Sequence, residues 1–197
     1  MTTDYISKAD FRRIFQHLTY DNYLAVRLSL ETGLRIGDVV ALKSDCLKGT
    51  TLTFTAAKTG KSGKAEITKD LADKLRRYSA SDFIFASSSK LGHRTRQAVW
   101  KDVKKAAAAE GFAVNVAPHS ARKTFAVGVA QTQGIAAAQR ALQHDSQAVT
   151  AGYVLSGLFA DAKEHAHTSL RDDEVEALAD LIAEKVVTAI KKEHLLR

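Results

Sequence analysis

The spacing of apolar residues predicts a mainly helical chain. Between residues 7 and 19 the apolar side chains recur at intervals of three and four, which places them on one helical face: Phe11, Ile14, Phe15 and Leu18. Ser7 stands before this segment as a helix cap. Residues 21–32 predict a second helix, with Asp21 as its cap and Gly33 at the position of a helix C-cap. Residues 35–42 start a further short helix.

A strand pattern replaces the helical one in the next segment. Residues 50–56 (TTLTFTA) alternate polar and apolar, residues 65–68 (AEIT) form the returning strand, and the glycine-containing basic stretch TGKSGK connects them. The run DFIF at 82–85 fits either a third strand or a connector. Further helices are predicted at 69–78, 94–110, 119–133, 135–143 and 146–155. The expected fold class is therefore mainly α with a small antiparallel β-sheet (α+β).

The end of the chain has its own helical pattern. Apolar residues keep one face from Asp172 to Glu193, acidic residues crowd the start and lysines the end, as the helix dipole favours. We expect a main domain at 1–160, a linker at 161–170 and a C-terminal amphipathic helix at 171–197. This helix would either dock on a neighbouring protomer or fold back on its own domain.

Composition excludes several classes of protein. Hydrophobic residues make up 45% of the 197, enough for a sizeable core. The single cysteine, Cys46, allows no internal disulfide and no cysteine-rich metal cluster, and is best interpreted as a small buried hydrophobe. The sequence contains no apolar stretch long enough to span a bilayer, and MTTDYISKADF is not a signal peptide. We therefore expect a cytoplasmic protein without a membrane partner.

The net charge of +7 is unevenly distributed. Residues 171–197 carry a net charge of −2, so residues 1–170 carry +9. The positive field therefore belongs to the main domain and not to a tail. A basic folded domain indicates a polyanionic partner, nucleic acid first.

Four segments contain candidate functional side chains. An arginine follows a helix-ending Gly-Leu in TGLR, 32–35, and lysines occupy the hairpin turn of AAKTGKSGKA, 56–65. In PHSARKTFA, 118–126, a histidine and an arginine stand three apart at a helix start, where both face one way and where anions bind. In ALQHDSQAVTAGYV, 141–154, a tyrosine follows a histidine by nine positions. Taken singly, these features also fit a surface arginine, a solvated turn, a capped helix and a core aromatic.

Together, these segments resemble in order and spacing the catalytic domain of the tyrosine recombinases, the phage-integrase family. The resemblance covers roughly residues 5–155, and the H-x-x-R box with the following His-to-Tyr spacing is its most specific part. It assigns the catalytic positions to Arg35, Lys58, His119, Arg122, His144 and Tyr153, with Asp38 as a supporting acidic residue.

The resemblance implies attack of the Tyr153 hydroxyl on a DNA phosphodiester. A 3′-phosphotyrosyl bond would form and a 5′-hydroxyl would leave, so that strands are rejoined without ATP. Arg35 and Arg122 would bind the nonbridging oxygens. His119 is the candidate proton acceptor, His144 would contact the phosphate, and Lys58 would protonate the leaving oxygen.

Two departures from the family pattern stand near these residues. The family often has L-G-H where this chain has Leu142-Gln143-His144, and often a leucine where this chain has Ala121. A literal LGH at 91–93 lies upstream of the H-x-x-R box with no tyrosine at the required distance, so it is not the counterpart. The basic residues expected to contact the DNA backbone are Lys61, Lys64, Arg94, Arg96 and Lys123.

The expected partners are a double-stranded DNA recombination site and other recombinase protomers in a synaptic complex. No cofactor or metal is expected, and His165 and His167 are interpreted as part of a solvated linker. Little chain precedes Arg35, so the upstream core-binding domain usual in the family is expected to be absent. The alternatives are a DNA-binding protein of the same fold without cleavage, a type IB topoisomerase, and a helical interaction module that binds no nucleic acid.

Overall fold

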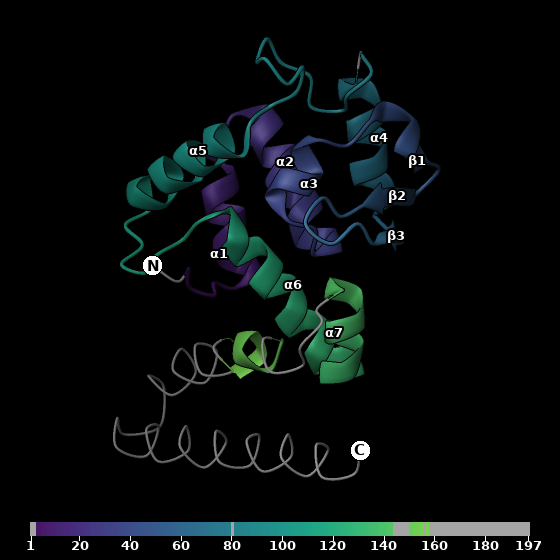
Figure 1. The fold of residues 1–197 in the computed structure, drawn as a ribbon. Helices are drawn as coiled ribbons and strands as arrows, with labels where there is room; N and C mark the ends of the chain where they lie inside the picture. Colours follow the sequence, from purple (N-terminus) through teal and green to yellow (C-terminus); the bar gives the residue numbers. More distant parts are fainter. Residues whose placement is uncertain (1–2, 80, 144–149, 156, 158–197) are drawn as a thin grey trace, which may run out of the picture.

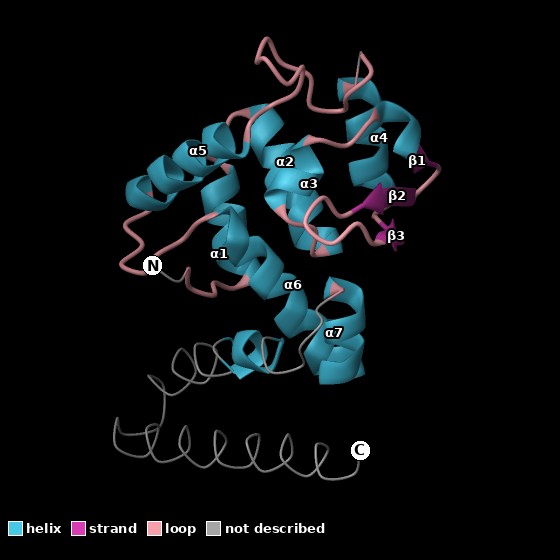
Figure 2. Cartoon of the chain, viewed as in Figure 1, coloured by secondary structure: helices cyan, strands magenta, loops and turns pink. Residues whose placement is uncertain are grey.

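The computed structural model describes residues 3–79, 81–143, 150–155 and 157. Figure 1 traces the chain from the N-terminus to the C-terminus, and Figure 2 separates its helices from its small sheet. In chain order the α-helices and strands are α1 (Lys8–Phe15), α2 (Tyr20–Thr32), α3 (Ile36–Val40), β1 (Leu47–Lys48), β2 (Thr51–Thr55), β3 (Ser62–Glu66), α4 (Lys69–Tyr78), α5 (Arg96–Ala109), α6 (Pro118–Gln133) and α7 (Ile135–Leu142), and residues 150–155 are also helical. The expected fold class, mainly α with a small antiparallel sheet, is confirmed.

Helix α2 is the centre of the fold. It packs against α3, α4, α5 and α6, and Figure 1 shows α5 on one side of it and α4 with the sheet on the other. A helix covered on several sides buries residues all around its circumference instead of along one stripe. The buried residues of α2 include Leu24, Ala25, Val26 and Leu28.

The N-terminal caps of the first two helices were predicted from the sequence, one correctly and one wrongly. Ser7 caps α1 as predicted, in a reciprocal capping box with Asp10. Asp21 does not cap α2: the helix begins at Tyr20 after Thr19, and Asp21 pairs with Arg94 instead. The cap prediction was wrong because a partner distant in sequence binds that carboxylate.

The sheet has the order β1-β2-β3 and is antiparallel throughout. The returning strand begins at Ser62, earlier than predicted, because Thr55 pairs with Ser62 and shortens the turn. Lys64 therefore lies on β3 and Lys58 in the turn itself. The run at 82–85 is a connector, with an isolated bridge between Phe83 and Lys43.

Candidate active site

The TGLR segment turns sharply at Gly33. This residue ends α2 in the left-handed region, at φ 70°, and a Cβ there would come within 2.4 Å of Phe125 Cδ1. Both features require glycine. The Ser29 hydroxyl donates to the Leu34 carbonyl at 2.7 Å, and the chain re-enters helix immediately after Arg35. The turn therefore places Arg35 at the N-terminal end of α3.

Arg122 is buried, with 3% of its surface exposed. Its Nη1 donates to the Gly33 carbonyl and its Nη2 to the Leu142 carbonyl at 2.8 Å, so one guanidinium joins the ends of α2 and α7. Its Nε is buried and lacks a hydrogen-bond partner within the described residues. Burial, and then the charge of Arg35, lower the pKa of Arg122 to about 10, so the group stays protonated at neutral pH.

Asp38 connects α3 to the lysine hairpin. Its Oδ1 accepts a hydrogen bond from the Ala57 N–H at 3.0 Å, one residue before Lys58, while its Oδ2 is buried without a partner in the described chain. Asp38 lies three residues after Arg35, which is the interval of neighbours on one helical face. The carboxylate thus holds the turn that carries Lys58 close to the helix that begins after Arg35.

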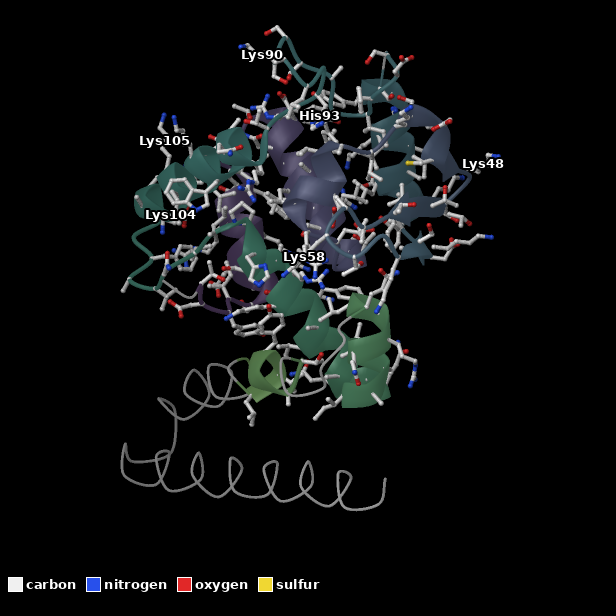
Figure 3. All side chains as sticks on the ribbon, viewed as in Figure 1. Lys48, Lys58, Lys90, His93, Lys104 and Lys105 are labelled. Atoms are coloured by element: carbon white, nitrogen blue, oxygen red, sulfur yellow. The ribbon has the colours of Figure 1, made fainter. Side chains whose placement is uncertain are left out.

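These segments enclose a cleft of about 470 Å³. The ionisable side chains that line it are Arg35, Asp38, Lys58, Arg96, His119 and Arg122. Figure 3 labels Lys58, whose side chain lies near the start of α6 where the hairpin approaches it. Four cationic side chains and one carboxylate make the cleft suited to an anion.

Tyr153 lies beside this cleft, on helical residues 150–155. Its hydroxyl hydrogen-bonds His119 Nε2 at 2.7 Å, and the two rings meet edge to face, with centroids 5.5 Å apart. Burial, and then the charges of Arg122, Lys123 and Arg35, lower the pKa of His119 to about 4. A neutral imidazole at neutral pH can accept the tyrosine proton.

The structure brings five of the six predicted catalytic residues close to one another. Arg35, Lys58, His119 and Arg122 line the cleft with Asp38, and Tyr153 is hydrogen-bonded to His119. His144 lies outside the described residues, as do the predicted linker, the predicted C-terminal helix, His165 and His167. Within the described part no cluster of His, Cys, Asp or Glu could hold a metal ion. No described helix has the length and apolar character needed to cross a membrane.

The residues expected to contact DNA divide into two groups. Lys61, Lys64 and Arg96 are exposed, and Arg96 also lines the cleft. Arg94 is half-buried and has internal partners: its Nη1 pairs with Asp21 at 2.5 Å and its Nε donates to Asn22. Arg94 thus connects the loop before α5 to α2. Lys123 is half-buried and also has internal partners, which are described below.

Two features of the site were not predicted from the sequence. The backbone carbonyl of Gly33 holds Arg122, and a carbonyl leaves no mark in a sequence. Gln143 ends α7 in the left-handed region at φ 53°, the only non-glycine residue of the described chain with positive φ. The sequence did contain a signal for this conformation. Gln143 stands where the family often has glycine, and glycine adopts the left-handed region without strain.

Comparison with known proteins finds a family model and a curated protein that match this chain. The family model described as "Phage integrase family" matches residues 4–157. The curated protein named "Probable integrase/recombinase YoeC", of Bacillus subtilis (strain 168), is 29% identical over 139 residues, which cover 68% of this chain and 76% of YoeC.

Solved structures share the fold at lower identity. The catalytic domain of bacteriophage HP1 integrase has a TM-score of 0.60 at 20% identity, with 87% of this chain and 100% of that domain covered. A lambda integrase(75–356) dimer bound to a COC′ core site has a TM-score of 0.67 at 20% identity, with 78% of this chain covered. XerH site-specific recombinase bound to a palindromic difH substrate has a TM-score of 0.65 at 16% identity, with 84% of this chain covered. The chain spans 60% of that lambda integrase chain and 53% of that XerH chain.

Proposed function

Because the chain belongs to the phage integrase family, we propose that it is a tyrosine recombinase, which cleaves and rejoins DNA strands through a covalent 3′-phosphotyrosyl intermediate. The observation that carries the proposal is the hydrogen bond between Tyr153 and His119 at the edge of the cationic cleft. The same histidine lines the cleft with Arg35 and Arg122, so the Tyr153 hydroxyl is bonded to a residue of the cationic site.

The proposed reaction is an exchange of esters. The Tyr153 oxygen attacks the phosphorus of a DNA phosphodiester, and its proton passes to His119 Nε2. The bond from phosphorus to the 5′-oxygen breaks, and that oxygen takes a proton from Lys58. The reverse sequence rejoins the strand, and because the ester bond is retained, no nucleotide cofactor is consumed.

The cleft supplies positive charge where the reacting phosphate would gain negative charge. Arg35 and Arg122 remain ionised and present planar donors, each worth roughly 3–4 kcal/mol in a transition state when preorganised. Arg122 is preorganised because the carbonyls of Gly33 and Leu142 hold its two terminal nitrogens. His144 is proposed as a further phosphate donor.

The proposed partners are duplex DNA and other protomers. Solved relatives include lambda integrase as a dimer bound to a DNA core site and as a tetramer bound to a Holliday junction. On this chain the exposed Lys61, Lys64 and Arg96 extend the basic surface beyond the cleft. We expect binding dominated by phosphate contacts, and therefore steeply weakened by salt. The segment 171–197, which the sequence predicts to be an amphipathic helix, is proposed to dock on a neighbouring protomer.

The experiment starts without a known DNA site. The protein is incubated with a pool of nicked duplexes whose centre is randomised, and DNA joined to protein is recovered after denaturation in SDS. The nick lets the cleaved end diffuse away, so the phosphotyrosyl adduct accumulates. Sequencing the recovered DNA defines one duplex for later assays. We expect an adduct with the wild type and none with Tyr153→Phe.

The matched control is Tyr20→Phe, which changes an exposed tyrosine at the start of α2 and should leave adduct formation unchanged. An adduct that survives Tyr153→Phe would refute the nucleophile. A pool from which the wild type recovers no more DNA than Tyr153→Phe would refute the function.

A further inference from the structure

Lys123 follows Arg122 directly, yet its ammonium group contacts the nucleophile. Its Nζ lies 5.3 Å from the centroid of the Tyr153 ring. Lys123 is four residues after His119 on α6, so the two side chains lie on one helical face. His119 thus holds the Tyr153 hydroxyl while Lys123 lies over its ring.

The same ammonium group is anchored to the N-terminal segment, residues 3–6. Lys123 Nζ donates to the Thr3 carbonyl. Asp4 N–H donates to the Asn115 carbonyl at 3.0 Å, and its carboxylate accepts from the Asn115 N–H at 2.7 Å. The Thr124 hydroxyl donates to the carbonyl of Ile6 at 2.6 Å. Residues 3–6 are therefore bonded both to the segment before α6 and to α6 itself, and the Thr3 carbonyl fixes the position of the Lys123 ammonium group.

We propose that Lys123 is a positioning residue, which uses its anchor on the N-terminal segment to hold the Tyr153 ring so that the hydroxyl stays on His119. This inference rests on the proposed role of Tyr153. Residues 3–6 would then help to position the proposed nucleophile, although they lie about 150 residues before it in the sequence.

A lysine that contacts DNA would behave differently. Removing a phosphate contact weakens DNA binding and lowers the salt dependence of binding by about one unit of slope. A positioning lysine leaves both unchanged and instead alters the rate at which bound DNA is cleaved. The pKa of Lys123 is lowered, because burial outweighs the opposing charge of Asp4, which fits a half-buried side chain with internal partners.

The test uses the single nicked duplex recovered from the pool. Two quantities are measured for each variant: the cleavage rate of saturating DNA in a single turnover, and Kd at several salt concentrations. For Lys123→Met we expect cleavage about tenfold slower, with Kd and salt slope as in the wild type. Lys123→Arg should recover most of the rate, because a guanidinium also binds the face of an aromatic ring. Lys101→Met, at an exposed lysine on α5, is the control for loss of charge.

The anchor is tested separately by Asp4→Ala, whose folding is checked by its thermal unfolding curve. We expect it to slow cleavage in the wild-type background and to add little to Lys123→Met, because the bond from Asn115 to the Asp4 carboxylate would act on Tyr153 only through the Thr3 carbonyl that holds Lys123. Equal single-turnover rates for Lys123→Met and the wild type would overturn the inference. So would a lower salt slope with an unchanged rate. Absence of any adduct with the wild type would instead overturn the proposed function itself.

Discussion

Protonation of His119 gives the sharpest test of the site. The imidazole is shielded from water and lies near three cationic side chains, which together lower its pKa from 6.5 to about 4. Burial is the largest cause, followed by Arg122, Lys123 and Arg35. One pKa unit corresponds to about 1.4 kcal/mol, so the shift has an upper bound of about 3 kcal/mol, reduced by the partial exposure of the ring.

The sign of the effect on stability follows from proton binding. Between pH 6.5 and about 4 the unfolded chain binds a proton at His119 and the folded chain does not. The free energy of unfolding therefore falls as the pH is lowered through this window, by at most about 3 kcal/mol, and His119 contributes no pH dependence above it. Cleavage should persist well below pH 6.5, because the proton acceptor remains neutral there.

The assay combines spectroscopy with unfolding. The protein has seven histidines, and His119→Gln identifies the signal of His119 in an NMR titration of labelled imidazoles. We expect a midpoint near 4, rising in Arg35→Met because one repelling charge is removed. The free energy of unfolding, measured in urea at pH 7 and at pH 4.5, should differ less between the two pH values for His119→Gln than for the wild type. A His119 midpoint near 6.5 would refute the reasoning.

Four further predictions concern the surroundings of the cleft. Gly33→Ala should lower the free energy of unfolding by about 2–4 kcal/mol, through strain at positive φ and the clash described above, and urea unfolding measures it. Arg122→Met should cost about 3 kcal/mol in the same assay, because two buried carbonyls lose their donor; a loss below 1 kcal/mol would contradict the geometry. Arg94→Ala should cost about 1–2 kcal/mol and leave the salt slope of DNA binding unchanged, whereas Arg96→Ala should lower that slope by about 1 and leave stability within about 0.5 kcal/mol. Trp100, the single tryptophan, is 50% exposed and four residues after Arg96, so saturating DNA should change its fluorescence; constant emission would place the DNA elsewhere.

The sequence was sufficient where the signals are local. The spacing of apolar residues located α1, α4, α6 and α7, and the segment containing α5, within a few residues, because a helix face and its caps are set by side chains within one or two turns. Ser7 and Gly33 could be assigned to helix ends for the same reason. The order of the motifs was also enough to name the family, since each box is a short pattern with its own spacing.

Local signals do not show the contacts that a residue makes with partners distant in sequence. Arg94 and Lys123 have the exposed-looking context of DNA-binding residues in the sequence, but packing turns one toward Asp21 and the other toward Tyr153 and Thr3. The strand β1 was not predicted, because two residues contain no periodicity and exist as a strand only through pairing with β2.

By itself the sequence determined the helices, the hairpin, the chemical groups of the site and the family to which they belong. Only the tertiary structure decided how those groups act on one another. Arg122 meets the Gly33 carbonyl across 89 residues, and the low pKa of His119 arises from burial and from charges on α6 and at the start of α3. Desolvation and Coulomb interactions depend on distances in space, which the order of residues along a chain does not contain.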